Sequence, residues 1–139
     1  MPGLISGQAV VAGDASGELM VSSEPLSFWG GYDSRTGEII DRRHPLSGQI
    51  AKGRVLALPG TIGSSTTTAV LLEAVRAGTA PAAMLTIGVD SFLALASVVS
   101  NEMYSRVIPL VALQQEQFQQ LLSSTKAHVR ADGSVQVLD

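Results

Sequence analysis

The stretch "GRVLALPGTIGSSTTTAVLLEAVRAGTAPAAMLTIG", residues 53–88, decides the fold. It begins with a short apolar run between a glycine and a proline, which predicts a buried strand. A Gly-rich turn follows, and then apolar residues at helical spacing that end at Gly78. The apolar run "PAAMLTIG" closes the stretch and predicts a second strand. This order of strand, helix and strand favours an α/β domain with a partly parallel sheet.

The alternation of helices and strands continues after this stretch. Residues 90–102, "DSFLALASVVSNE", predict a helix with Asp90 or Ser91 as its N-cap, because both side chains accept hydrogen bonds from helix amides. Residues 107–113, "VIPLVAL", predict a strand. Pro109 lacks an amide hydrogen, so we expect this strand to lie at an edge or to end near the proline.

The two ends of the chain are richer in strands. Residues 5–28 are expected to form two short strands, broken at Gly13 and Gly17. At the other end, the Gln-rich run 114–125 predicts a helix, and residues 126–138 predict a hairpin closed by the turn "ADGS". With 139 residues the chain is expected to be a single domain over residues 1–139, of the α/β or layered β/β/α type.

Composition excludes several classes of function. A net charge of −3, scattered basic residues and 4% aromatic content argue against a nucleic-acid partner. The sequence has no cysteine, so the chain can form neither a disulfide nor a thiolate-bound iron–sulfur cluster. No apolar run approaches the roughly 18 residues of a membrane span, and the N-terminus lacks the pattern of a signal peptide, so we expect no membrane and a cytoplasmic location. The charged fraction of 15% is low, which suggests that a partner covers part of the surface.

Five consecutive hydroxyl side chains, residues 64–68, follow Gly63 where the first predicted helix begins. A helix N-terminus exposes unpaired amide groups, so this turn suits an anion or a carboxylate. The same residues also suit a helix cap, for which one serine or threonine suffices, or a catalytic hydroxyl. A phosphate-binding P-loop is excluded because no lysine lies between Lys52 and Lys126. The residue pattern leaves the other three interpretations open.

Two other segments carry side chains that suit binding. Phe28 and Trp29 precede a glycine pair in a predicted loop. They either fold this loop onto the core or form a wall for a partner or substrate. Arg42, Arg43 and His44 precede a proline, and they form either a solvated charged loop or a site for a carboxylate.

Two separated motifs are associated with the hydroxyl-rich turn, by which we mean residues 59–68: one precedes it in the sequence and the other contains it. The first, "PLSFWGGYDSRTGEIIDRRHPLSG" (residues 25–48), begins with the pattern P-L-S-F-[WL]-G-G-x-[DN]-x-x-T-G-x-[IV]-x-D. The second, "GRVLALPGTIGSSTTTAVLLEAVRAGTAPAAML" (residues 53–85), combines a strand, a Gly-Ser turn, a helix and an Ala-Pro strand. Together these motifs resemble the small subunit of the aconitase X family, and the similarity runs from about Ile5 to Leu113.

The resemblance implies a layered β/β/α domain like the swivelling domain of aconitase, which completes an active site built mainly by another subunit. It also implies that this partner is a large, cysteine-containing subunit that holds iron or an iron–sulfur cluster, whereas the small chain binds no cofactor itself. The family dehydrates cis-3-hydroxy-L-proline to a pyrroline-2-carboxylate, mainly in bacteria, or mevalonate 5-phosphate, mainly in archaea. The similarity to bacterial members favours hydroxyproline, a small carboxylate, as the substrate.

The resemblance also implies roles for the residues of the turn. Ser64 corresponds to the serine that the family is proposed to use as the base, and it would remove the proton next to the substrate carboxylate. A metal on the large subunit would act as a Lewis acid on the departing hydroxyl. Gly63, Ser65 and Thr66 would contact or orient the substrate, and Ser65 or Thr66 is also expected to cap the helix. The alternatives are the small subunit of a mevalonate 5-phosphate dehydratase and a non-enzymatic anion-binding module.

Overall fold

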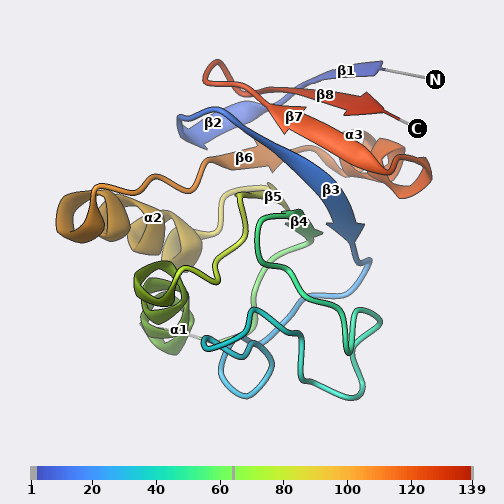
Figure 1. Ribbon diagram of the computed structural model, residues 1–139. Helices are drawn as coiled ribbons and strands as arrows, with labels where there is room; N and C mark the ends of the chain where they lie inside the picture. The colour runs from blue at the N-terminus through green and yellow to red at the C-terminus, as the bar shows by residue number, and fades with distance from the viewer. Residues whose placement is uncertain (1–2, 64, 139) are drawn as a thin grey trace.

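A computed structural model describes residues 3–63 and 65–138 of the chain. The fold is built on an eight-stranded sheet (Figure 1). Its strands are β1 Gly3–Ser6, β2 Gln8–Val11, β3 Ala15–Val21, β4 Val55–Leu58, β5 Ala83–Ile87, β6 Leu110–Leu113, β7 Lys126–Val129 and β8 Ser134–Leu138. The strand order is β1-β8-β7-β3-β4-β5-β6-β2, and the four strands from β3 to β6 pair in parallel. The expectation of a partly parallel sheet is therefore confirmed.

The N-terminal segment almost closes the sheet on itself. Strands β1 and β2 lie at the two ends of the strand order, yet only Gly7 separates them in the sequence. The Gly7 amide donates to the Gly133 carbonyl oxygen at 3.1 Å. A Cβ atom on Gly7 would come within 2.4 Å of the Val111 side chain, which explains why the chain bends at a glycine here.

The expected strand breaks at Gly13 and Gly17 are only partly correct. Gly13 lies between β2 and β3, but Gly17 lies inside β3, and the additional break is at Gly7. A Cβ atom on Gly17 would approach the Gly53 carbonyl oxygen to 2.7 Å. This glycine therefore permits close packing of the backbone and does not end a strand.

Three helices and one 3-10 turn accompany the sheet. They are α1 Ser65–Ala77, α2 Ser91–Tyr104, α3 Gln115–Gln119 and the 3-10 turn η1 Gln120–Ser123. Helices α1 and α2 pack side by side at the lower left in Figure 1, whereas α3 contacts β5 and the 3-10 turn contacts β3. None of the helices described over residues 3–63 and 65–138 is long and apolar enough to cross a membrane.

The helix expected over residues 114–125 is shorter than predicted. The α-helical part ends at Gln119, and the chain tightens into the 3-10 turn before β7 begins. Phe118 and Leu121, three residues apart, are both buried in the core. Side chains at this spacing align in a 3-10 geometry, so the tighter turn keeps both in the core.

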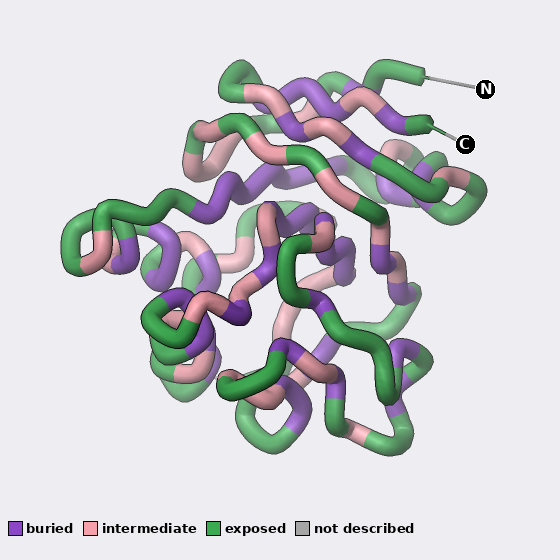
Figure 2. Tube along the Cα trace, in the orientation of Figure 1, coloured by how far each residue is buried: buried purple, intermediate pink, exposed green. Residues whose placement is uncertain are grey.

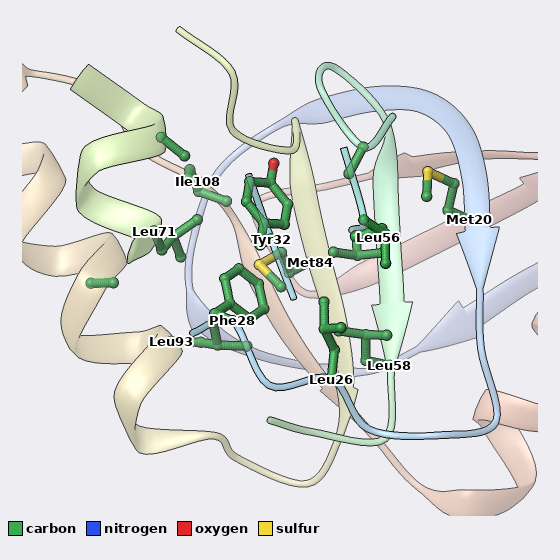
Figure 3. Packing of buried hydrophobic residues seen from close by; sticks show 14 of the residues in the cluster. Met20, Leu26, Phe28, Tyr32, Leu56, Leu58, Leu71, Met84, Leu93 and Ile108 are labelled. Atoms are coloured by element: carbon green, nitrogen blue, oxygen red, sulfur yellow. The ribbon is translucent and has the colours of Figure 1, made fainter. Parts of the chain in front are cut away.

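The core consists of two apolar layers, one between the central strands and the helices and one between the central strands and β7 and β8, which gives a β/β/α arrangement. Along β4 the residues alternate between them: Leu56 faces the helices, and Val55 faces the strands β7 and β8. Consecutive residues of the central strands β4, β5 and β6 are buried, as the colours of Figure 2 show, so both faces of these strands are covered. Figure 3 shows Phe28 beside Leu93 in the layer against the helices. Burial on both faces explains why the central strands read as continuous apolar runs. The layered α/β fold predicted from the sequence is confirmed.

The long segment between β3 and β4 forms part of the helix-side layer. Phe28 is completely buried and stacks on Tyr32, with the ring centroids 5.0 Å apart. The Tyr32 hydroxyl donates to the Thr79 carbonyl oxygen at 2.8 Å, just beyond the end of α1. Burial raises the pKa of the Tyr32 hydroxyl above its ordinary range, so this side chain keeps its proton and its hydrogen bond.

Candidate active site at the carboxyl end of the parallel strands

Two helix N-termini meet at one edge of the sheet. Strand β4 ends at Leu58 and leads through the hydroxyl-rich turn into α1, whereas β5 ends at Ile87 and leads through Gly88–Asp90 into α2. Because β4 and β5 are parallel neighbours, both turns lie at the same end of the sheet. The Ile87 amide donates to the Pro59 carbonyl oxygen at 3.2 Å and joins the two connections. This carboxyl edge is where open α/β sheets bind ligands.

The first motif, residues 25–48, forms backbone hydrogen bonds with the hydroxyl-rich turn. Leu26 forms an isolated parallel bridge with Thr61. The Leu26 amide donates to the Gly60 carbonyl oxygen at 3.4 Å, and the Ile62 amide donates to the Leu26 carbonyl oxygen at 3.1 Å. The segment "PLSFWGG" therefore lies directly beside the hydroxyl-rich turn, although the two are more than 30 residues apart in the sequence.

The Asp90 carboxylate ties the hydroxyl-rich turn to the start of α2. Its Oδ2 atom accepts hydrogen bonds from the Thr61 amide at 2.9 Å and from the Thr61 hydroxyl at 2.7 Å. Its Oδ1 atom accepts from the Phe92 amide at 3.2 Å and the Leu93 amide at 3.1 Å. Asp90 is thus the N-cap of α2, as predicted, and it also fixes the position of the neighbouring turn.

The hydroxyl groups described in α1 divide into two pairs. Thr67 and Thr68 are buried, whereas Ser65 and Thr66 are exposed. The Thr68 hydroxyl donates to the Phe92 carbonyl oxygen at 2.9 Å, a second link between the two helices. The Thr67 Oγ1 atom is buried without a hydrogen-bond partner among the described residues. A buried polar group of this kind is rare, because its removal from water is uncompensated.

Gly63 has a backbone conformation that residues with a side chain rarely adopt. Its φ of +119° is in the region that favours glycine. A Cβ atom at this position would lie 3.7 Å from Oγ1 of both Thr66 and Thr67. Gly63 is exposed, so its backbone is open to a ligand from outside the chain. Together, the glycine and the helix N-terminus form a surface that suits an anion.

The predicted site residues are only partly described by the structure. Gly63, Ser65 and Thr66 lie together at the exposed start of α1, and their contacts with a substrate remain predictions. Ser64 lies outside the described residues. Helix α1 is described from Ser65 onward and the residue before it lies outside the described residues, so the capping role expected of Ser65 or Thr66 stays a prediction. The roles of Thr61 and Asp90 in holding the turn were not predicted from the sequence, although Asp90 carried the local signal of a helix N-cap.

The aromatic pair of the first motif has two different roles. Phe28 is buried in the core, as one interpretation of the pair predicted, but Trp29 is 71% exposed. The chain direction between them is fixed by the Ser27 hydroxyl, which donates to the Trp29 carbonyl oxygen at 3.1 Å. Phe28 therefore folds the loop onto the core, whereas the Trp29 side chain is exposed to solvent.

The basic segment after this motif is a solvated loop around one buried histidine. Arg42 and Arg43 are exposed, whereas His44 is 7% exposed. The His44 Nδ1 atom accepts from the Leu46 amide at 3.1 Å, so Nε2 carries the ring hydrogen and faces the Glu24 carbonyl oxygen at 3.2 Å. Both ring nitrogens thus serve to hold the loop, and His44 has none left for a ligand.

Fold and site together define a class: a layered β/β/α domain that presents a hydroxyl-rich turn at one edge of its sheet, as swivelling domains do. Residues 4–137 match the family described as the aconitase X swivel domain. The chain belongs to the aconitase X swivel domain family. The expected family and its domain type are therefore confirmed.

Some relatives in this family are much longer than this chain, and others are similar to it in length. The chain is 46% identical to a cis-3-hydroxy-L-proline dehydratase of Pseudomonas aeruginosa, an alignment that covers 96% of this chain and 23% of that protein. It is 35% identical to a phosphomevalonate dehydratase small subunit of Methanothermobacter thermautotrophicus, which covers 90% of this chain and 92% of that subunit. The crystal structure of aconitase X from Thermococcus kodakaraensis in its holo-form superposes with a TM-score of 0.84 at 29% identity, over 99% of both chains.

The relatives that are named hydroxyproline dehydratases contain much more protein than this chain. The chain spans 23% of the length of the Pseudomonas aeruginosa protein and 20% of the length of a relative from Hypocrea jecorina. The domain thus occurs as one part of a long protein in these relatives and as a separate small subunit in the archaeal ones.

Proposed function

We propose that this chain is the small subunit of a two-subunit hydro-lyase that dehydrates cis-3-hydroxy-L-proline to a pyrroline-2-carboxylate. The observation that carries this proposal is the exposed helix N-terminus at Gly63, Ser65 and Thr66, presented at the carboxyl edge of a swivelling domain. The 46% identity to a cis-3-hydroxy-L-proline dehydratase supports this substrate over mevalonate 5-phosphate, whose dehydratase small subunits are 32% to 43% identical to this chain. The domain alone is expected to be inactive, because about three quarters of that longer relative lies outside the segment that matches it.

The proposed reaction is an α,β-elimination of water that begins at Ser64. The Ser64 hydroxyl oxygen, as its alkoxide, accepts the proton from the carbon next to the substrate carboxylate, and the electron pair of that C–H bond forms the new carbon–carbon double bond. The substrate C–O bond breaks, and the departing hydroxide takes up the proton from Ser64, directly or through solvent, to leave as water and restore the alkoxide. Removing this proton places negative charge on the carboxylate. The amide groups at the start of α1 stabilise such charge, because a helix N-terminus favours an anion.

A serine needs its surroundings to act as a base. An alkoxide is unfavourable in water at neutral pH, and the positive end of a helix dipole lowers that cost. The segments around this turn contain no basic residue between Arg54 and Arg76 or between Arg76 and Arg106. We therefore propose that any cation near Ser64 comes from the partner subunit.

The residues of this chain do not fit a metal cluster. The sequence has no cysteine, and within the described ranges no three histidine, aspartate or glutamate side chains are grouped to hold a metal ion. We propose that the iron or iron–sulfur group of the enzyme is bound by the large, cysteine-containing subunit, where it would supply a Lewis acid for the departing hydroxyl. We also propose that the complex acts in the cytoplasm.

A second candidate is suggested by the archaeal relatives, in which the matched domain is a separate small subunit. The phosphomevalonate dehydratase small subunit is matched over 92% of its length, whereas the hydroxyproline dehydratases are matched over 23% or less. This makes the small subunit of a mevalonate 5-phosphate dehydratase the alternative. A non-enzymatic module that binds anions at the same turn is the third possibility.

One assay separates these functions. The chain is co-expressed with the large aconitase X subunit of its source genome, and the purified complex and each chain alone are supplied with cis-3-hydroxy-L-proline or mevalonate 5-phosphate. We expect the complex to consume hydroxyproline and each chain alone to be inactive. Turnover of mevalonate 5-phosphate in its place would establish the alternative. Turnover of neither substrate, with an anion bound by the small chain alone, would establish the binding module.

A further inference from the structure

The N-terminal halves of α1 and α2 carry almost no charge. The segments 59–72 and 88–101, which contain both turns and the starts of both helices, include a single charged residue, Asp90. Four hydrogen bonds already engage its carboxylate. At the other end of α1, by contrast, Glu73 and Arg76 form an exposed ion pair. The centres of protein interfaces are depleted in charged residues in the same way.

Apolar side chains are exposed on this uncharged surface. The Thr61–Asp90 hydrogen bonds hold together the two turns that carry Ile62 and Val89, and exposed apolar residues follow in α2 at a spacing of three residues. The exposed members, which we call the apolar rim, are Ile62 (57%), Val89 (56%), Phe92 (37%), Leu95 (52%) and Val98 (51%). Large apolar groups gathered in one place on a surface mark an interaction site.

The family relatives indicate what covers this surface. In the relative from Pseudomonas aeruginosa the matched segment is 23% of one continuous protein, so about three quarters of that protein lies outside it. In the relative from Methanothermobacter thermautotrophicus the segment is a separate small subunit. A domain that occurs both fused and separate has to meet its partner through a noncovalent surface in the separate form. A surface with apolar side chains and few charges suits this role.

We propose that the apolar rim is the surface on which the large subunit docks, so that the exposed start of α1 faces the joint active site. The choice of partner rests on the proposed function. The rim begins at Ile62, directly before Gly63, and continues along α2, so docking there encloses the turn at one edge of the interface. Enclosure excludes water from the turn and strengthens its electrostatic effect on a bound carboxylate.

The test compares two exposed leucines. Leu95 lies in the apolar rim and is 52% exposed, whereas Leu4 in β1 is 60% exposed and lies outside it. The variants Leu95→Glu and Leu4→Glu are titrated against the purified large subunit of the source genome by calorimetry. Thermal unfolding followed by circular dichroism checks that each variant is folded, and Val98→Glu repeats the test at a second rim position.

We expect Leu95→Glu and Val98→Glu to weaken binding by at least about 30-fold, the loss typical of a central interface residue. Leu4→Glu is expected to bind within about threefold of the unchanged chain, because isolated surface substitutions have small effects. Rim variants that bind like the unchanged chain, or a Leu4→Glu variant that is equally weakened, would overturn the proposal. A source genome without a large subunit would also overturn it, as would a homodimer of this chain that Leu95→Glu dissociates.

The experiments distinguish a failure of the docking proposal from a failure of the proposed dehydratase function. A complex that depends on the rim but dehydrates neither substrate would leave the docking surface in place and refute the reaction. A complex that dehydrates hydroxyproline and tolerates Leu95→Glu would do the opposite. Both readouts come from the same purified proteins.

Discussion

The Asp90 carboxylate holds Thr61 by two hydrogen bonds, one of 2.7 Å to the hydroxyl and one of 2.9 Å to the amide. The same side chain caps α2, so a single residue fixes the distance between the two helix N-termini at the carboxyl edge. A shift of α2 is therefore transmitted to the turn that begins α1. Asp90 is a positioning residue for the candidate site and has no oxygen left for a ligand.

Removal of the Asp90 carboxylate should loosen both helices. Asp90→Ala deletes the cap and the two bonds to Thr61, and we expect the free energy of unfolding to fall by about 2–3 kcal/mol. Urea denaturation of the isolated chain measures this loss. Asp90→Asn separates the two roles, because asparagine keeps the cap at Oδ1 but its amide NH2 cannot accept from the Thr61 amide, so an intermediate loss of about 1–2 kcal/mol is expected. Substitutions at ordinary surface sites change the free energy of unfolding by up to about 0.5 kcal/mol. An Asp90→Ala variant whose free energy of unfolding stays within about 0.5 kcal/mol of the unchanged chain would therefore contradict this role.

The two buried threonines of α1 should respond in opposite ways to the same substitution. Thr67→Val removes a hydroxyl without a described partner and keeps the shape of the side chain, so stability should be unchanged or rise by up to about 1 kcal/mol. Thr68→Val removes the hydrogen bond to the Phe92 carbonyl oxygen and should cost about 1 kcal/mol. Parallel denaturation curves compare the variants. Equal losses in both would show that Thr67 is bonded in solution.

Gly63→Ala should reduce both stability and activity. An alanine at a φ of +119° is strained, so we expect a loss of about 1–3 kcal/mol in the free energy of unfolding. Gly48→Ala is the matched control, because Gly48 has a φ of +86°, no atoms near a new Cβ, and a position outside the turn. Both variants should lose stability, but only Gly63→Ala should lower kcat/KM of the complex at a temperature where both are folded. Equal kcat/KM values would remove Gly63 from the substrate site.

The aromatic pair of the first motif should separate into a core residue and a surface residue. Phe28→Ala empties a fully buried position and should cost about 3–5 kcal/mol. Trp29→Ala alters a side chain that is 71% exposed and should change stability by less than about 0.5 kcal/mol. Differential scanning calorimetry of both variants checks this difference. A large loss for Trp29→Ala would place its ring against the core in solution.

The sequence predicted the central elements because their signals are local. Within residues 53–88 both faces of each strand and one face of the helix are apolar. This pattern alone predicts a sheet that is covered on both faces, with the helix on one of them. Asp90 was predicted as a cap for the same reason. Its bond to Thr61 joins residues 29 positions apart, and no local pattern indicates such a pair.

Where the prediction was wrong, contacts between distant residues decided the structure. The bend at Gly7 depends on Val111, and the continuity of β3 at Gly17 depends on the Gly53 carbonyl oxygen. The candidate site came from the family resemblance, because composition and spacing left a helix cap, an anion site and a catalytic hydroxyl open and favoured the cap. The burial of Thr67 could be found only from the packing of α1 on α2.

The turnover number of the complex with Ser64→Ala tests the central claim most directly, with Ser65→Ala as the neighbouring control. If Ser64 is the base, kcat for cis-3-hydroxy-L-proline should fall by at least about 100-fold in Ser64→Ala, the usual worth of a general base. Folding and affinity for the large subunit should remain unchanged, and Ser65→Ala should keep more than about a tenth of kcat, since an orienting hydroxyl contributes less. A Ser64→Ala complex that retains more than about a tenth of the unchanged kcat would contradict the account.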